Sequence, residues 1–482
     1  MSVPDLVPLL ADWRSHRGPL HQCLALAVTS LIEARLLRPG DRLPSERALA
    51  RRLGISRTTV AGAYDLLRQR GALHSVRGSG TTVTGDRTLR HDPAIAALAA
   101  NPFIRSTHPR HSTDSVDLTV CRFDPPTILA ETLAHSADAL LDLIGSGHDT
   151  AGLPELRSAL ADHLTGHGLP TQPSQLLITT GSQQAPALIA SDLERNDRVM
   201  IEDPTYFGAL HAYLQRRARL LPCSVDHLER AAGLAADEHR VDLVHVTSAV
   251  HNPTGRQLDD ATGRRVVELA GRWGATVVDD QALRFLADRP PPFLTTHDPH
   301  ADIITIGTFS KVLWSALRVG WLRAPAPAIA RFSARKAALD LATPALDQAL
   351  VLHCLPHIDA LAAHRRQQLT HQRTHLRRRL RQDLPLWHDA SGDSGPFLWV
   401  RTHLDDADPI VQAAARVQVG ITAGRTLTPT DRWNSHIRIA VTTTDTALDA
   451  AVDRLADLAR TFDDGSPLTA PASSMTTHRL RP

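Results

Sequence analysis

Lysine is almost absent from this sequence: of its 53 basic residues only Lys311 and Lys336 are lysines, and the rest are arginines. Arginine replaces most surface lysines at little cost, but it cannot replace a lysine that reacts as a neutral amine, because a guanidinium stays charged. Each lysine is therefore a candidate for chemistry. For Lys336, in a helix-like stretch, we expect an ordinary surface position, whereas the surroundings of Lys311 favour a reactive amine.

Cysteine and long apolar runs are also scarce. The widely spaced cysteines form no CxxC pair, which argues against a disulfide framework or a zinc site and for a reducing compartment. No apolar run approaches about 18 residues, and the first residues lack a basic segment followed by a long apolar one. We therefore expect no membrane span, no signal peptide, no metal and a cytoplasmic location. The four cysteines are Cys23, Cys121, Cys223 and Cys354.

The remaining composition is that of a globular protein, with 42% hydrophobic and 22% charged residues. A length of 482 residues suggests about two to four domains. The net charge of +2 hides an asymmetry, because residues 1–90 carry about 14 arginines against about 7 acidic residues. A basic N-terminal module indicates a polyanion partner. A merely solvated basic surface is the alternative.

The N-terminal part of the sequence predicts three helices and a hairpin. Apolar residues recur at helical spacing, and Ser45 and Gly54 suit the two ends of the second helix. A weak alternation around a Gly-Ser-Gly tip then predicts a two-stranded wing. This is the pattern of a mostly helical winged helix-turn-helix domain. The expected ranges are 20–37, 46–53 and 56–69 for the helices, 73–83 for the wing and 1–84 for the domain.

The third predicted helix presents its first residues for DNA recognition. Residues at the start of such a helix reach base edges in the major groove. Arg57 is the best candidate for a bidentate guanine contact, and Thr58 and Thr59 suit phosphate or a thymine methyl group. Arg47, in the helix predicted over 46–53, and Arg77, on the predicted wing, suit the DNA backbone. The alternative is a small helical adaptor that binds protein.

The stretch from Arg35 to Val83 closely resembles the GntR-type winged helix. It contains the phrases LPSERALA, ISRTTV, YDLL and GSGT in this order. The resemblance implies double-stranded operator DNA as the partner. It also implies contacts to DNA from the five residues just named: Arg47, Arg57, Thr58, Thr59 and Arg77.

From residue 117 onward, short apolar segments alternate with longer helical patterns. That alternation predicts an α/β domain with a mainly parallel sheet, ending in a small α+β portion after a long helix over 364–384. We expect a linker over 85–115, this domain over 116–463 and a disordered tail over 464–482. The expected strands are 175–179, 198–202, 243–247, 276–278, 303–306, 397–401 and 437–441.

Lys311 lies in a segment suited to an aldehyde cofactor. A predicted strand leads into hydroxyl residues, then the lysine, then an arginine. An aldehyde cofactor needs a lysine amine to form a Schiff base. Its phosphate needs hydroxyl donors and a bidentate cation, for which Thr308, Ser310 and Arg318 are suitable.

Two further segments suit the same cofactor. Ser182 and Gln183 lie in a turn between a strand and a helix, which is typical of a phosphate cradle. The Asp279-Asp280 pair ends a strand, where α/β folds place ligands. A carboxylate facing a pyridine nitrogen keeps it protonated, and we favour Asp279 for this role.

Asn252 and Tyr206 complete the set. The Asn252 amide, in a turn after a strand, suits the ring hydroxyl of the cofactor, and Tyr206 suits its ring face. Each segment alone has an ordinary interpretation as a helix start, a strand-end cap or a turn. Their combination in this order favours the cofactor site.

The combination resembles fold-type I pyridoxal-phosphate enzymes, the aspartate-aminotransferase group, and with the GntR-type helix-turn-helix it resembles the MocR family of regulators over roughly residues 15–462. The resemblance implies a multidomain fold, with an aminotransferase-like α/β domain and a head-to-tail homodimer. It implies that Lys311 forms the Schiff base with pyridoxal 5'-phosphate. It also implies that Arg438 binds the carboxylate of an amino-compound effector.

Two positions depart from the family pattern. Gln281 stands where a tyrosine is common, two residues after the ring-nitrogen aspartate, and His148 stands where another tyrosine is common. Gln281 could still donate to the ring oxygen, and His148 could still contact phosphate. Both changes count more against efficient transamination than against cofactor binding.

The sequence therefore favours a transcriptional regulator that senses pyridoxal phosphate, an amino compound or both. The alternative is an active aminotransferase that carries a DNA-binding module. A third possibility, a GntR-type repressor that has lost the cofactor, is disfavoured because Lys311, Asp279, Asn252 and Arg318 are all present.

Overall fold

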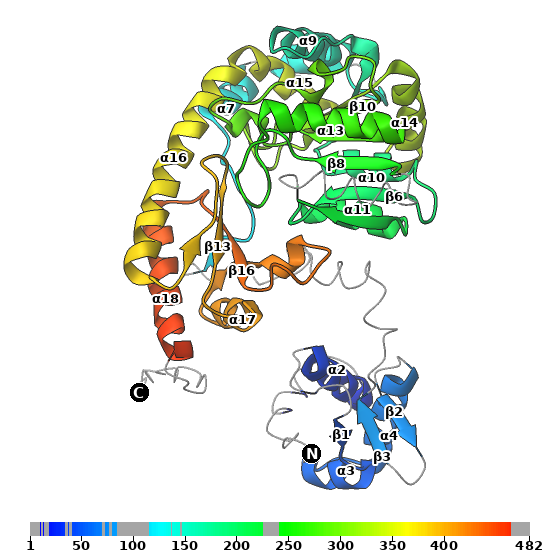
Figure 1. The fold of residues 1–482 in the computed structure, drawn as a ribbon, viewed down its shortest axis with the longest axis vertical. Helices are drawn as coiled ribbons and strands as arrows, with labels where there is room; N and C mark the ends of the chain where they lie inside the picture. The colour runs from blue at the N-terminus through cyan, green and yellow to red at the C-terminus, as the bar shows by residue number, and fades with distance from the viewer. Residues whose placement is uncertain are drawn as a thin grey trace, which may run out of the picture. The chain divides into compact units, whose positions relative to one another are not determined.

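A computed structural model of the chain divides into two compact units, Met1–Ala96 and Ala97–Pro482, each considered by itself (Figure 1). The division falls inside the segment expected to be a linker. Arg77, the linker except Ser115, and the tail lie outside the described residues. The structure describes residues 10, 13, 19–33, 37, 41–69, 73–76, 80–83, 115–135, 137–144, 147–224 and 241–463.

The N-terminal unit is the predicted winged helix-turn-helix. Its helices pack on an antiparallel three-stranded sheet of order β1-β3-β2. The two-residue strand β1 was not predicted, because its segment has the composition of a turn. The elements are α2 (Leu20–Glu33), β1 (Arg42–Leu43), α3 (Glu46–Leu53), α4 (Arg57–Gln69), β2 (Leu73–Val76) and β3 (Gly80–Val83).

Capping residues set the geometry of α3 as predicted. The Ser45 side chain accepts a hydrogen bond from the Ala48 amide at 3.2 Å, and Gly54 ends the helix with φ of +65°. A glycine suits this left-handed position because it has no Cβ. In the core, the fully buried Tyr64 donates to the Pro44 carbonyl at 2.9 Å, so that its polar end is satisfied.

The second unit is built on a seven-stranded sheet of order β5-β11-β10-β9-β8-β6-β7. All neighbouring pairs are parallel except those made by β11. The predicted strands agree within a few residues, but β7 and β11, which contain Pro222 and Gly320, were missed. The strands are β5 (Leu176–Thr180), β6 (Arg198–Glu202), β7 (Arg219–Cys223), β8 (Leu243–Val246), β9 (Thr276–Asp280), β10 (Ile303–Thr308) and β11 (Val319–Arg323).

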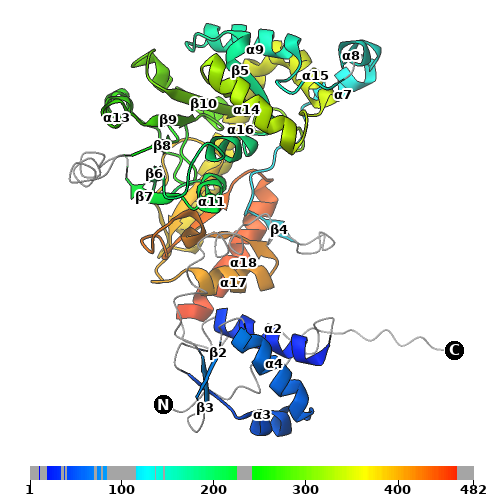
Figure 2. The same cartoon turned by 90° about the vertical axis from the view of Figure 1, so that its right-hand side faces the viewer.

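Helices cover both faces of this sheet, which is why its strands are apolar throughout. Figure 2 shows α13 on one side and α11 and α14 on the other. Successive strand residues therefore face different cores: Val277 packs toward α13 and Val278 toward α11 and α14. The helices are α7 (Thr127–His135), α8 (Ala137–Ile144), α9 (Pro154–Gly166), α10 (Gln184–Ala190), α11 (Phe207–Gln215), α13 (Asp260–Trp273), α14 (Ala326–Leu339) and α15 (Ala345–Cys354).

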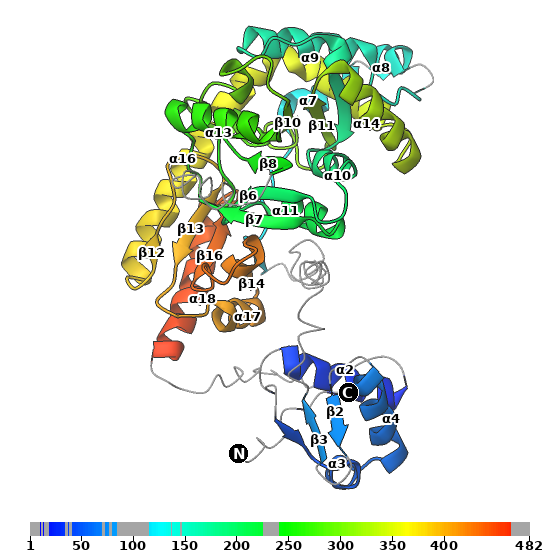
Figure 3. The same cartoon turned by 45° about the vertical axis from the view of Figure 1, so that its right-hand side comes forward.

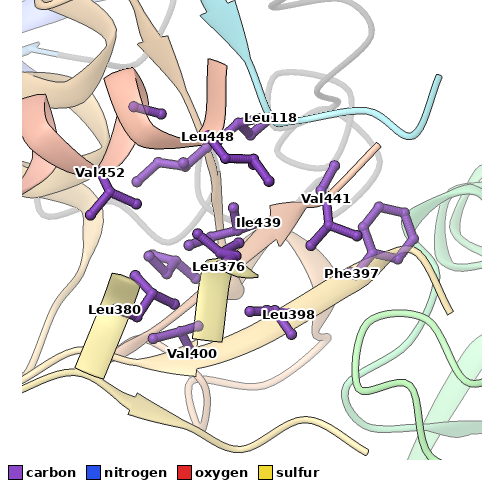
Figure 4. Packing of buried hydrophobic residues seen from close by; sticks show 14 of the residues in the cluster. Leu118, Leu376, Leu380, Phe397, Leu398, Val400, Ile439, Val441, Leu448 and Val452 are labelled. Carbon is purple, nitrogen blue, oxygen red and sulfur yellow. The ribbon is translucent and has the colours of Figure 1, made fainter. Parts of the chain in front are cut away.

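The long helix α16 (Ile358–Asp383) leads into the predicted α+β portion, where it runs beside α18 (Figure 3). It begins six residues before the predicted start. Leu369, Leu376 and Leu380 of this helix pack with α18 and the strands in one core (Figure 4). The other elements here are β4 (Val116–Asp117), β12 (His388–Asp389), β13 (Phe397–Arg401), α17 (Asp408–Arg416), β14 (Val419–Gly420), β15 (Thr422–Ala423), η7 (Gly424–Leu427), β16 (His436–Ala440) and α18 (Asp445–Asp463).

Across the described parts of the chain, no helix combines the length and hydrophobicity needed to cross a membrane.

Candidate functional site

The candidate cofactor residues gather at one edge of the large sheet. Ser182 follows β5, Tyr206 follows β6, Asn252 follows β8, Asp279 lies in β9 and Lys311 follows β10. These strands share a direction, so their carboxyl ends meet at the same edge, where α/β proteins bind ligands. The topology therefore brings together residues that are up to 129 positions apart in sequence, from 182 to 311.

Lys311 is half-buried in the loop between β10 and β11. Its Nζ lies 3.5 Å from the Cys121 carbonyl. The Thr308 hydroxyl donates to the Val319 carbonyl at 3.0 Å, and the Ser310 hydroxyl donates to the Leu317 carbonyl at 2.7 Å. Both predicted phosphate donors thus brace the loop that carries the lysine, and their role toward a phosphate stays a prediction.

The turn after β5 lies directly against Arg318. Gly181 has φ of +70°, and a Cβ at this position would come within 2.5 Å of the Arg318 guanidinium. Among the described residues this exposed guanidinium forms no ion pair. An unpaired cation beside a glycine turn that opens a helix fits a phosphate group.

Gln183 connects this turn to Tyr206. The Tyr206 hydroxyl donates to Gln183 Oε1 at 2.6 Å, and Gln183 Nε2 donates to the Gly208 carbonyl at 3.2 Å. Ser182 is half-buried in the same turn. The predicted phosphate turn and the predicted ring-stacking residue are therefore in contact.

Lys336 stabilises the same turn through Asp340. The expectation that Lys336 occupies a surface position was wrong. Its side chain is fully buried, and Nζ lies 2.7 and 2.9 Å from the two Asp340 oxygens. Asp340 also accepts from the hydroxyl of Thr180 at 3.0 Å and from the amide of Gln184 at 2.7 Å. Lys336 follows the buried residues Ile329 and Phe332 at helical spacing, a signal that predicts the inward face.

Asp279 is completely buried on the α13 side of the sheet. It accepts hydrogen bonds from Ser248 and Gln281, both at 2.7 Å, and from the Leu294 amide at 3.3 Å. Burial raises the pKa of Asp279, and these hydrogen bonds oppose the rise. Gln281 donates its second amide hydrogen to Ser248. Both amide hydrogens of Gln281 are therefore donated to Asp279 and Ser248. A hydrogen bond from Gln281 to the ring oxygen of the cofactor stays a prediction.

Asp280 points to the opposite face, as alternation along a strand requires. Its Oδ2 lies 3.8 Å from His245 Nε2. Burial, with the Asp280 charge, raises the pKa of Tyr206 to about 12, while Arg438 and Arg318 oppose the rise. The charges of both candidate anion-binding arginines therefore favour the ionised form of this phenol.

Arg438 is a buried charge beside Asn252. It is only 2% exposed and donates to Asn252 Oδ1 at 2.9 Å and to the Thr119 carbonyl at 2.7 Å. Its Nε has no hydrogen-bond partner, and the guanidinium lies 4.3 Å from the centre of the Phe397 ring. Burial lowers the pKa of Arg438 to about 10. A buried guanidinium without an ion pair among the described residues fits a carboxylate ligand.

Asp203 is a structural feature of the site that sequence reasoning missed. It is 5% exposed and accepts hydrogen bonds from Thr428, Thr430 and Trp433. It thereby fastens the turn before Tyr206 to the C-terminal portion of the unit. The only sequence signal was an acidic residue before Pro204, which is also typical of an ordinary turn.

His148, the second departure from the family pattern, is exposed in the loop before α9. No contact of its side chain links it to the cofactor edge among the described residues, and a role at the phosphate stays a prediction.

The N-terminal unit exposes most of the predicted DNA-contacting residues. Arg57 at the start of α4 has a side chain 72% exposed, with Nε 3.5 Å from Glu46. Arg47 and Thr58 are also exposed. Thr59 is half-buried, and its amide donates to the Ser56 hydroxyl at 3.1 Å, which caps α4. The first turn of α4 is therefore available to a ligand.

Two family models match the chain. Residues 133–455 match aminotransferase class I and II, and residues 21–83 match bacterial regulatory proteins of the gntR family. The two matches correspond to the two compact units.

Curated relatives share this arrangement over most of their length. The uncharacterised HTH-type transcriptional regulator YisV of Bacillus subtilis is 27% identical over 424 residues, covering 82% of this chain and 87% of the relative. The probable rhizopine catabolism regulatory protein MocR of Rhizobium meliloti is 31% identical, covering 64% and 66%. The pyridoxine biosynthesis regulator PdxR of Corynebacterium glutamicum is 30% identical, covering 62% and 65%.

Solved aminotransferases share the fold of the second unit. The α-aminoadipate aminotransferase LysN of Thermus thermophilus, complexed with N-(5'-phosphopyridoxyl)-L-leucine, has a TM-score of 0.67 at 22% identity, covering 79% of this chain and 99% of that one. An archaeal alanine:glyoxylate aminotransferase has a TM-score of 0.69 at 21% identity, covering 78% and 99%.

Proposed function

Because the chain belongs to the aminotransferase class I and II family and joins that domain to a gntR-family DNA-binding domain, we propose that it is a transcriptional regulator controlled through pyridoxal phosphate. The aminotransferase domain indicates this cofactor. The observation that carries the proposal is the presence of both domains on one chain, as in relatives named transcriptional regulators. Those relatives favour a regulator over an aminotransferase.

The residues at the sheet edge would hold the cofactor as follows. Lys311 supplies the amine that binds its aldehyde carbon, and Arg318 with the turn at Ser182 binds its phosphate. Asp279 keeps its ring nitrogen protonated, and Tyr206 covers its ring face. When bound, the cofactor supplies an electrophilic carbon to which an amino compound can add.

Arg438 and Asn252 would receive the effector. The unpaired Nε of Arg438 and its lack of an ion pair support a carboxylate ligand at this position. The effector would then be an amino compound with a carboxylate, whose amine lies at the cofactor in place of the Lys311 amine and whose carboxylate lies at Arg438. To regulate, it must bind two arrangements of the protein with different affinity.

A second copy of the chain would complete the assembly as a head-to-tail homodimer. Helices α7, α8 and α15 contact one another and, with the end of α14, expose several leucines. Exposed apolar side chains gathered on neighbouring helices are typical of a protein interface. These leucines are Leu133, Leu141, Leu339, Leu341 and Leu346.

The visible absorbance spectrum with added pyridoxal phosphate tests the cofactor part. We expect a yellow band in the wild type that Lys311→Ala abolishes, with Arg57→Ala, an exposed position in the other unit, as the control that keeps the band. Absence of the band in the wild type would mean that the pocket does not bind the cofactor covalently.

DNA binding tests the regulatory part. Fluorescence anisotropy with DNA flanking the protein's own gene, searched for direct repeats, should show binding that depends on Arg57. Amino compounds should change that affinity only when the cofactor is present. An affinity unaffected by any amino compound, together with rapid turnover of an amino donor and a keto acceptor, would instead favour the aminotransferase.

A further inference from the structure

Two histidines and an aspartate converge on the surface, away from the cofactor edge. His163 lies in the last turn of α9, His167 directly follows that helix, and Asp359 lies in the first turn of α16. One ligand atom of each residue lies within 4.8 Å of the others. The cofactor site uses none of these three residues.

The hydrogen bonding of His167 leaves a lone pair directed at Asp359. Its Nδ1 lies 2.7 Å from the His163 carbonyl, which can only accept, so Nδ1 carries the hydrogen. In the neutral ring Nε2 is then an acceptor, yet it lies 3.3 Å from the Asp359 carboxylate, which is also an acceptor. Two facing acceptors require a positive charge between them.

A proton on Nε2 would satisfy this pair alone, but it would not explain the third residue. The rings of His163 and His167 are only 4.1 Å apart between centroids, so a second imidazole lies beside the first. A charge on one ring disfavours a charge on the other. A divalent cation, in contrast, is bound by both imidazoles and the carboxylate together.

We propose that His163, His167 and Asp359 form a site for a divalent transition metal, with Zn²⁺ as the fitting ion. Two imidazole nitrogens and one carboxylate oxygen are ligands that Zn²⁺ takes, with water in the fourth position. The carbonyl that fixes Nδ1 of His167 is the outer-sphere partner such ligands have. The absence of CxxC pairs, which predicted no zinc site, concerns a different ligand set.

The metal would join the end of α9 to the start of α16, the helix that connects the two parts of the unit. Helix α16 spans two cores: Ile358 belongs to the core that includes Leu156 of α9, whereas Leu376 and Leu380 pack in the C-terminal core. A metal held between His167 and Asp359 would fix the start of this helix to the end of α9. The site therefore clamps one end of the helix that connects the two parts of the unit.

Zn²⁺ titration of the full-length, untagged protein by calorimetry tests the site. His163→Gln/His167→Gln is compared with His371→Gln/His375→Gln. The second pair has the same spacing on α16, but each of its histidines faces its own carboxylate, Asp445 or Asp449. We expect one Zn²⁺ per chain in the wild type and the control, and binding at least about tenfold weaker in the His163/His167 variant.

Asp359→Asn provides a second variant on a residue whose side chain is 69% exposed, so that it tests the site without endangering the fold. It should also weaken Zn²⁺ binding by at least about tenfold. Co²⁺ should give the visible spectrum of a tetrahedral ion in the wild type, and Lys311→Ala should retain it. Equal Zn²⁺ affinity in all proteins, or loss only in the His371/His375 control, would overturn the proposal and leave a protonated His167–Asp359 ion pair.

Discussion

The turn that carries Tyr206 should loosen when Asp203 is replaced by alanine. The buried Asp203 carboxylate accepts from the hydroxyls of Thr428 and Thr430 and from the Trp433 indole, the last at 3.0 Å. Hydrogen bonds to a charged acceptor contribute about 1.5 kcal/mol each at the low end, or about 4.5 kcal/mol for three. Removing a buried charge offsets part of this loss. We therefore expect a net destabilisation of about 3 kcal/mol.

Urea unfolding of the full-length chain, followed by circular dichroism and tryptophan fluorescence, measures this loss. Thr430→Val removes one of the three hydrogen bonds and should cost about 1 kcal/mol. Asp203→Asn keeps one acceptor oxygen and should fall between the two.

Cofactor affinity provides a second measurement. A general loss of stability would lower the free energy of unfolding but would not by itself weaken cofactor binding to the folded protein. With its turn released, Tyr206 pays an ordering cost when it covers the ring, and we expect pyridoxal phosphate to bind about tenfold more weakly to Asp203→Ala, equivalent to about 1.4 kcal/mol. A variant within about 0.5 kcal/mol of the wild type, with unchanged cofactor affinity, would refute the reasoning.

Three further perturbations follow from the site. Arg438→Lys keeps the charge but loses the planar fork, so the effect of amino compounds on DNA affinity should fall at least about tenfold while the cofactor band persists; an undiminished effect, measured by anisotropy, would exclude Arg438 as the effector residue. Lys336→Met removes the buried charge beside Asp340, and equilibrium dialysis should show pyridoxal phosphate binding weakened about tenfold; unchanged binding would mean that the turn holds its shape without the ion pair. Burial lowers the pKa of His251 and His436 from 6.5 to about 4, so the unfolded chain binds more protons between these values. This stability contribution is complete above pH 6.5 and is lost as the pH falls toward 4; urea midpoints that stay constant over this range would contradict it.

Local patterns were sufficient to predict that the candidate cofactor residues lie at one edge of the sheet. The residues Asp279, Asn252 and Lys311 each occur within or directly after an apolar strand, and a parallel sheet brings such strand ends together without further information. The caps of α3 were predictable for the same reason, since Ser45 and Gly54 act on their own helix. Both features were predictable because their signals lie in short segments of sequence, although the sheet is what brings the strand ends together.

Features that depend on distant packing were not predictable. Asp203 and Thr428 are 225 positions apart, and nothing near either residue indicates the other. The burial of Lys336 follows from the packing of α14 against the sheet, and its polarity outweighed the helical spacing in the sequence interpretation. Gln281 was considered as a cofactor ligand because it stands where the family has a tyrosine, and nothing near it in sequence indicates its hydrogen bond to Ser248, 33 positions away.

Two of the contacts between the large sheet and the C-terminal portion lie beside the proposed ligand, and they differ in one respect. Asp203 joins Thr428 and Trp433 through side chains that no carboxylate effector needs. Asn252 joins Arg438, the residue proposed to bind the effector. An effector carboxylate that engages Arg438 therefore competes with or reshapes one contact and leaves the other in place. Under the proposed function, one contact that changes with the effector and one that does not would let binding shift the C-terminal portion without separating it from the sheet.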